Sequence, residues 1–313
     1  MLKKLVTWTG CIAWCALALV AVQAEEAKPV ETTDVVENAT PVVNTRQIGD
    51  LSWHTEYAAA YRQARDEHKQ LLLFFRDEKD LLTAGQFEAN VLAKPELKPV
   101  LSKFVLAAIP TSTMAPLAKD AKPEDKPVRV LDYQAFVHMH KQAGLAIVDL
   151  HNEKDHLYGK VVSAHPFSSN TLTNVASVKI MLELPRGTIT QRVLTYVLRI
   201  HPEQPASVWG NGDPMLFEQC RIASQLMVNY GSVGHHDWGN RSALVGSHFG
   251  VSPMEVASIG GGATLFEAAH SAVSVWRGSG VHWGMMITPN RHFGYDMVQS
   301  ANGTWFANGI FVQ

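Results

Sequence analysis

The sequence predicts an α/β protein built from two parts, and three observations lead to this fold class. First, the chain has 313 residues, 46% of them hydrophobic, which is enough to bury the cores of two domains. Second, from about residue 47 to 184, short apolar segments alternate with helical patterns, as expected when helices cover a central sheet. Third, Leu184-Pro185-Arg186-Gly187 breaks one helical pattern and a new one follows at once, which places a domain boundary near residue 185.

The first 24 residues have the three parts of a secretory signal peptide. Lys3 and Lys4 precede an apolar run from Leu5 to Val20, and the small-residue site Val22-Gln23-Ala24 follows it. We therefore expect cleavage before Glu25, a secreted or periplasmic location, and no transmembrane segment in the cleaved chain.

Charge and cysteine content narrow the function classes further. Beyond the signal peptide the chain carries 25 basic and 29 acidic residues and no Lys/Arg-rich run, which argues against nucleic acid as a partner. Cys11 and Cys15 leave with the signal peptide, so the cleaved chain keeps Cys220 alone and can form no internal disulfide. Because Cys220 lies among apolar residues of a helical pattern, we expect a buried, unreactive thiol.

The elements of the N-terminal part follow from local patterns. Residues 25–46 are polar and lack periodicity, so we expect a flexible tether, with folding beginning near Ile48. The elements expected next are a helix over 55–68, a strand over 71–75, a broken helical stretch over 84–103, a strand over 104–109, a Pro/Lys/Asp-rich loop over 112–126, a helix over 132–142, strands over 145–150 and 158–164, and a helix over about 169–183.

This order of elements resembles a thioredoxin-like domain over residues 47–184, with Trp53 and Leu71-Leu72-Leu73-Phe74-Phe75 as the most suggestive residues. Where thioredoxins have Trp-Cys-x-x-Cys after this strand, the chain has Arg76-Asp77-Glu78-Lys79-Asp80. Disulfide exchange requires a thiolate, and this part of the sequence contains no cysteine. The resemblance therefore implies a redox-inactive domain that serves as a scaffold or binds.

Two helices are expected at the start of the C-terminal part. Thr188 with Gln191 forms a capping-box pattern for the first, which ends at His201-Pro202 because a residue before proline disfavours the α region. Pro214 suits the first turn of the second helix. Their buried faces are expected to be the apolar stripes Ile189, Val193, Tyr196, Val197 and Ile200, and Leu216, Cys220, Ala223, Met227 and Tyr230.

Four short signals follow in the last eighty residues or so of the chain. They are Gly234-His235-His236-Asp237-Trp238, Glu255, Trp276 and His282 with five residues between them, and Phe293-Gly294-Tyr295 running into Asn302-Gly303-Thr304-Trp305-Phe306. Two histidines and a carboxylate from three separate segments can converge on one pocket. There they could hold a divalent metal or polarise a ligand.

The order of these signals resembles the CAP superfamily of secreted proteins, which includes cysteine-rich secretory, antigen 5 and pathogenesis-related-one proteins, over residues 185–313. The resemblance, to the cysteine-poor bacterial type, implies an α-β-α sandwich with helices on both sides of a small antiparallel sheet. It implies a divalent metal such as zinc on His236, Glu255 and His282, although the first position could equally fall on His235. The ligand-binding residues that it implies are His235, His236, Glu255, Trp276 and His282.

Each of these residues also has a structural interpretation. A double histidine after a helix is often a polar loop, and Glu255 could simply pair with Arg241. His282 could be a core histidine that is hydrogen-bonded to the backbone. The family's second pocket glutamate is absent, because the chain reads Arg277-Gly278-Ser279 at that position.

The sequence favours binding over catalysis. It has no Gly-x-Ser-x-Gly, no His-Glu-x-x-His and no phosphate-cradling glycine loop. We therefore expect a secreted or envelope protein whose C-terminal part binds an unidentified ligand or protein partner, with or without a metal, while the N-terminal part is a scaffold. A metal-dependent hydrolase using the same pocket is the first alternative, and a structural interaction module is the second.

Overall fold

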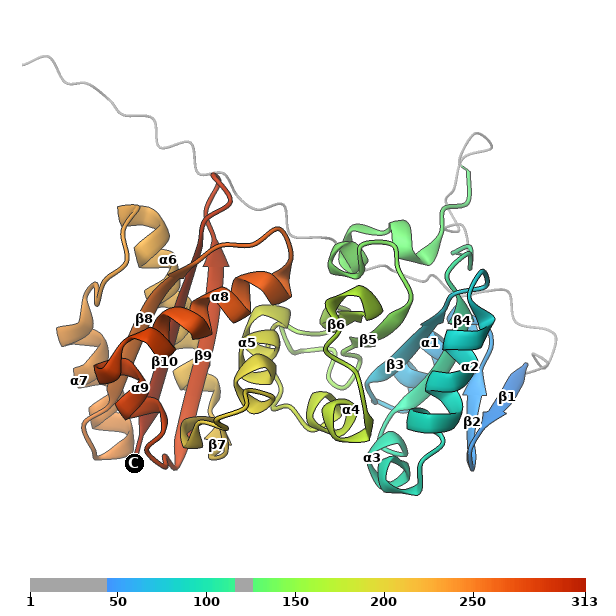
Figure 1. Ribbon diagram of the computed structural model, residues 1–313, viewed down its shortest axis with the longest axis horizontal. Helices are drawn as coiled ribbons and strands as arrows, with labels where there is room; N and C mark the ends of the chain where they lie inside the picture. The colour runs from blue at the N-terminus through green and yellow to red at the C-terminus, as the bar shows by residue number, and fades with distance from the viewer. Residues whose placement is uncertain (1–43, 116–125) are drawn as a thin grey trace, which may run out of the picture.

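The computed structural model describes residues 44–115 and 126–313, and Figure 1 shows them as two sheets, each covered by helices, with helix α5 between them. The expected signal peptide and nearly all of the expected tether lie outside the described residues. The protein has the α/β fold that the sequence predicts. In the described part of the chain, no helix is both long enough and apolar enough to span a membrane.

The N-terminal sheet has six strands in the order β1-β2-β4-β3-β5-β6. They are β1 (Thr45–Ile48), β2 (Leu51–His54), β3 (Leu71–Arg76), β4 (Val105–Pro110), β5 (Gly144–Val148) and β6 (Val161–Pro166). β4 pairs in parallel with β2 and β3, whereas β5 pairs antiparallel with β3 and β6. Because β1 begins at Thr45, residues 45 and 46 belong to a strand rather than to the expected tether.

Helices cover both faces of this sheet, since successive residues of a strand point to opposite sides. Leu71, Leu73 and Phe75 of β3 share a core with α1, and Leu72 and Phe74 share the other core with the remaining helices. The helical segments are α1 (Tyr57–Asp66), α2 (Leu81–Phe87), a π turn η1 (Glu88–Leu92), a 3-10 turn η2 (Pro95–Leu97), α3 (Lys98–Leu101), a 3-10 turn η5 (Phe167–Ser169) and α4 (Val175–Leu182).

One expected helix does not form as such. Residues 132–142 are covered in part by two 3-10 segments, η3 (Val130–Asp132) and η4 (Gln134–Met139). The second ends where His140 and Lys141 take left-handed φ values of 50° and 59°, which no right-handed helix can continue.

The C-terminal sheet has four strands in the order β7-β9-β10-β8, with β10 antiparallel to both β8 and β9. They are β7 (Asn211–Gly212), β8 (Met254–Gly260), β9 (His292–Gln299) and β10 (Trp305–Val312). α6 packs on one face of the sheet, while α5 and α8 pack on the other (Figure 1). The helical segments are α5 (Ile189–Arg199), a 3-10 turn η6 (Ala206–Val208), α6 (Pro214–Tyr230), α7 (Trp238–Phe249), α8 (Leu265–Gly278) and α9 (Gly280–Met286).

α6 approaches the sheet at backbone distance. A Cβ on Gly294 of β9 would lie 2.3 Å from the carbonyl carbon of Leu216, so only glycine fits there. Next to this contact, Cys220 donates its thiol hydrogen to the carbonyl of Gly294, with 3.1 Å between sulfur and oxygen. Burial raises the pKa of the Cys220 thiol well above its usual value, which is the buried thiol expected from the sequence.

Helix α5 packs against both sheets. It begins at the expected capping box of Thr188 and Gln191, and eight consecutive residues, Gln191–Leu198, are buried. Buried Arg192 donates to the Ser163 hydroxyl of β6 at 2.8 Å, and also to three carbonyls at the end of α4 and in the turn after it. The apolar core runs from one sheet to the other through this helix. Separate folding of residues 47–184 and 185–313 stays a prediction.

Candidate functional site

The candidate site is built on Glu255, the second residue of the edge strand β8. Its side chain is 1% exposed, and Oε2 lies 2.7 Å from Nδ1 of His235, whose side chain is 47% exposed. His235 comes from the loop between α6 and α7. Because a carboxylate only accepts hydrogen bonds, the imidazole Nδ1–H donates. The pair therefore fixes the ring with Nδ1 inward and leaves Nε2 free of this contact.

Two further side chains occupy the other oxygen of Glu255. Arg241 of α7 donates from Nη1 to Oε1 at 2.6 Å, and Asn308 of β10 donates from Nδ2 to the same oxygen at 2.9 Å. Arg241 also donates from Nη2 to the carbonyl of His236 at 2.8 Å, which fixes the loop. The pairing with Arg241, one of the structural interpretations, is thus present together with the contact to His235. Because both of its carboxylate oxygens accept hydrogen bonds, Glu255 fixes the positions of the side chains that donate to it.

These contacts set the charge of the site. Burial alone would raise the pKa of Glu255, but hydrogen bonds from His235, Arg241 and Asn308 and the charge of Arg241 together hold that pKa below its usual value. The bond to Glu255 raises the pKa of His235, against the opposing effect of partial burial. At neutral pH Glu255 is therefore ionised, and His235 keeps its proton to a higher pH than a free imidazole does.

His282, the third residue of α9, stands beside His235. The two ring centroids are 6.2 Å apart and the ring planes meet at 66°. Partial burial lowers the pKa of His282, and the positive charge of His235 lowers it further. Its Nδ1 is buried and has no hydrogen-bond partner among the described residues, so no described group fixes its tautomer. The cluster thus combines a readily protonated imidazole with a readily neutral one.

The structure turns His236 away from this cluster. Its Nε2 lies 3.0 Å from the carbonyl oxygen of Ser232, and its ring stacks on Tyr230 with centroids 4.5 Å apart. Of the two adjacent histidines that the sequence offered for the same position, His235 is therefore the one that contacts Glu255.

Trp276 lies in the core. It is fully buried on α8, and its ring packs against Tyr295 of β9 with 5.8 Å between centroids. Trp276 therefore packs α8 against the sheet and has no exposed surface that could contact a ligand.

The expected three-ligand metal set is not assembled. Within residues 44–115 and 126–313, no three side chains of His, Cys, Asp or Glu are grouped so that they could hold a metal ion. His236 faces away, and both oxygens of Glu255 are engaged. What remains is a pair of imidazoles, one of them oriented by a buried carboxylate, as in carboxylate–histidine–metal arrangements.

Sequence reasoning missed Asn308, which is fully buried in β10 and helps to fix the carboxylate of Glu255. A signal was available, because this asparagine interrupts the apolar segment Trp305–Val312, and buried amides need hydrogen-bond partners. The partner itself is 53 residues away in the sequence and could not be read from that signal.

A separate hollow of about 720 Å³ opens in the N-terminal part, at the carboxyl ends of the parallel strands β3 and β4. Asp77, Glu78, Lys79 and Asp80 line it. Carboxyl ends of parallel strands are common ligand sites. Here the lining carries charges of both signs and no thiol.

No protein-family model matches the chain, and no curated protein matches it. Among solved structures, an outer surface protein from Borrelia burgdorferi is similar over 33% of this chain and 75% of that protein, with 14% sequence identity and a TM-score of 0.27. A likeness at this level carries no argument about the fold or the function of the chain.

Proposed function

We propose that the protein is a secreted or envelope binding protein whose C-terminal part captures a ligand or partner at the cluster of His235, Glu255 and His282. In this proposal a divalent cation such as zinc lies between the two imidazoles, and open coordination positions take the ligand or water. The N-terminal part, which resembles a redox-inactive thioredoxin-like domain, serves as the scaffold.

The observation that carries the proposal is the hydrogen bond from His235 to the buried carboxylate of Glu255 next to a second imidazole. Neutral imidazole is the commonest metal ligand, and a carboxylate behind it fixes the ring and increases its basicity. Arg241 and Asn308 keep that carboxylate in place and ionised. The donor set fits a two-histidine cation site with Glu255 behind it, rather than the three-ligand set expected from the sequence.

Binding is favoured over hydrolysis by the state of Glu255. A metal-dependent hydrolase needs a general base within reach of the metal-bound water. Both oxygens of Glu255 already accept hydrogen bonds, and its pKa is lowered, which makes it a weak base. The hydrolase therefore stays the alternative, and the cluster supports capture of a ligand better than chemistry on it.

The test is the melting temperature of the purified protein with and without zinc. A cation that binds only the folded state stabilises it by RT ln(1 + [L]/Kd), about 2.7 kcal/mol at a hundredfold excess over Kd. Since a protonated imidazole cannot ligate and the pKa of His235 is raised, the zinc response should be larger at pH 8 than at pH 6. A response that grows towards acid would instead indicate an anion bound by protonated His235.

Adjacent histidines provide a matched control. His235→Ala and His282→Ala should each abolish the zinc-induced shift, whereas His236→Ala should retain it, because the ring of His236 faces Tyr230 and Ser232. Zinc-free melting of His282→Ala should stay close to that of the wild type. If His236→Ala is the one variant that loses the zinc-induced shift, the ion lies elsewhere and the proposal is refuted. The same conclusion follows if the shift is unchanged in His282→Ala.

A further inference from the structure

A second hollow, of about 610 Å³, lies where the N-terminal part meets the turn that leads into α5. Its walls come from the turn after α1, the segment between α3 and β4, the loop after β5 and the end of α4. The volume falls within the range of small-molecule sites, roughly 300–1,000 Å³, which are concentrated at junctions between domains. It shares no residue with the cluster around Glu255.

The floor of this hollow is apolar. Val100, Phe104 and Leu182 line it, and each keeps between 5% and 8% of its surface exposed. Contact with an apolar group would remove this surface and that of the ligand from water, which is favourable in proportion to the area covered. The floor therefore suits a hydrocarbon chain or ring.

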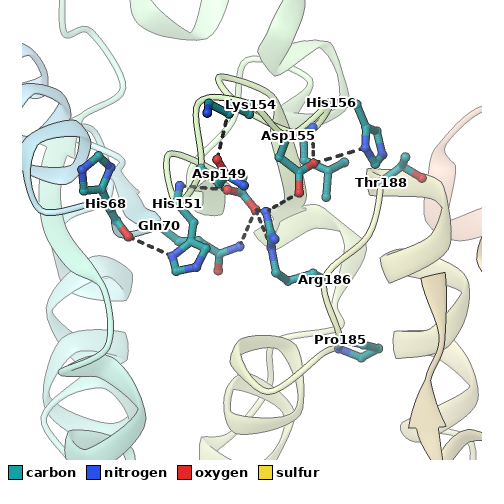
Figure 2. A network of polar contacts seen from close by, with 12 residues as sticks. His68, Gln70, Asp149, His151, Lys154, Asp155, His156, Pro185, Arg186 and Thr188 are labelled. Atoms are coloured by element: carbon teal, nitrogen blue, oxygen red, sulfur yellow. Dashed lines mark hydrogen bonds and ion pairs between the residues drawn. The ribbon is translucent and has the colours of Figure 1, made fainter.

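A buried carboxylate holds one polar wall in place, as Figure 2 shows. Asp149, which is fully buried, accepts hydrogen bonds from Gln70 Nε2 at 3.1 Å, from Arg186 Nη2 at 3.1 Å and from the backbone N–H of His151 at 3.0 Å. His151 in turn donates from Nδ1 to the carbonyl of His68 at 2.9 Å. Because these contacts within the protein already hold the side chains of Gln70, His151 and Arg186, little ordering of the wall is needed on binding.

Some of the positively charged side chains on the rim of the hollow are paired with carboxylates, and one is not. Lys69 pairs with Glu67 at 2.7 Å, and Arg186 pairs with two aspartates at 3.1 Å. The side-chain ammonium of Lys103, which also lines the hollow, makes no hydrogen bond or ion pair with the described residues. An anionic group would therefore find its counter-charge at Lys103, directly beside the apolar floor.

The negative charge of Glu183 on the same rim repels an anion, but that charge also interacts with Arg199. Burial lowers the pKa of the Arg199 guanidinium, and the negative charge of Glu183 offsets part of that effect. We propose that the hollow binds a small amphipathic anion, a carboxylate on a medium-length apolar chain, with the chain on the floor of Val100, Phe104 and Leu182 and the carboxylate at Lys103.

The test uses octanoate as the probe and saturation-transfer NMR titration of the full chain as the readout. Octanoate should bind, while octylamine, which has the same apolar body with the opposite charge, should bind more weakly. Lys103→Gln should weaken octanoate binding by about fivefold, the upper end for one exposed ion pair. Glu183→Gln should tighten it, because that change removes the opposing charge.

Opposite effects of the two variants separate a site from general destabilisation, which would weaken binding in both. Lys179→Gln on the exposed side of α4 is the matched control and should leave octanoate binding unchanged. Octylamine binding as tightly as octanoate, equal octanoate affinity in Lys103→Gln and wild type, or no octanoate signal at all would each overturn the proposal. The zinc response should be the same in Lys103→Gln as in the wild type, so this test and that of the cation site fail independently.

Discussion

A histidine buried between the two sheets should make the protein sensitive to acid. His165 of β6 is fully buried, and its ring meets Tyr196 of α5 at 4.7 Å and Phe266 of α8 at 4.8 Å between centroids. Burial lowers its pKa to about 3, and the charge of Arg192 acts in the same direction. The perturbation that tests this is His165→Phe, which keeps an aromatic ring in an aromatic site and removes the titrating group.

The direction in which stability changes with pH follows from the different pKa values of His165 in the folded and unfolded states. The unfolded chain takes up a proton at His165 near pH 6.5, whereas the folded chain resists protonation down to about pH 3. The contribution of His165 to stability is therefore intact above pH 6.5 and is lost progressively as the pH falls. At about 1.36 kcal/mol per pH unit, the loss is about 2 to 3 kcal/mol by pH 4.5.

Urea unfolding followed by circular dichroism at pH 7.5 and pH 4.5 measures this loss. Between those two conditions, His165→Phe should gain about 2 to 3 kcal/mol relative to the wild type, whatever its offset at pH 7.5. Other groups titrate equally in both proteins and cancel in the difference. If the two proteins lose the same stability on acidification, His165 is not a buried neutral imidazole and the reasoning is wrong.

Asp296 of β9 provides a control with the opposite sign. Burial raises its pKa to about 6, although Thr190, Gln191 and the backbone of Met297 donate hydrogen bonds to it. A buried acid with a raised pKa stabilises the fold below its unfolded value near 3.8, and that contribution is lost as the pH rises through 6. Asp296→Asn should therefore gain stability relative to the wild type as the pH rises from about 3.8 to about 6, and over the same range His165→Phe should change in the opposite direction.

Three further outcomes are expected. Arg241→Met leaves buried Glu255 without its charge partner and should cost about 3 to 5 kcal/mol in urea unfolding, and a loss well under 1 kcal/mol would show that the pair is dispensable. Cys220 should react with a thiol reagent only as fast as the protein unfolds, because it is buried with a raised pKa, and rapid reaction of native protein would contradict that placement. Fragments covering 47–184 and 185–313 should each melt cooperatively but below the temperature of the full chain, since separation exposes the contact between the sheets; a fragment without a cooperative transition would contradict the two-domain prediction.

Parts of this structure could be predicted from the sequence because patterns of neighbouring residues determine them. The start of α5 follows from a capping box of Thr188 and Gln191, in which all partners lie within four residues. The segments that carry Glu255 and His282 were likewise identified, and the structure places these two residues close to the same histidine, His235.

The choice between the two adjacent histidines could not be predicted, because it depends on the three-dimensional path of their loop and on a contact with Glu255, which is 20 residues from His235. Asp237 takes a left-handed φ of 53° at the start of α7, which sets the direction of the loop. Arg241 then holds the carbonyl of His236 while its other nitrogen reaches Glu255. Such geometry arises from tertiary packing, and neither hydrophobic periodicity nor residue spacing encodes it.

The enclosure of α5 also bears on how this sequence can change over generations. Most helices keep one face in water, where substitutions accumulate freely, and α7 is of this kind, with Arg241 and Val245 as its buried residues. Along Gln191–Leu198, α5 has no such face, because these residues are all buried and the helix packs against β6 of one sheet and β9 of the other. This helix should therefore diverge more slowly than any surface helix. Exchange of either half for another domain would therefore require new residues along α5 to match it.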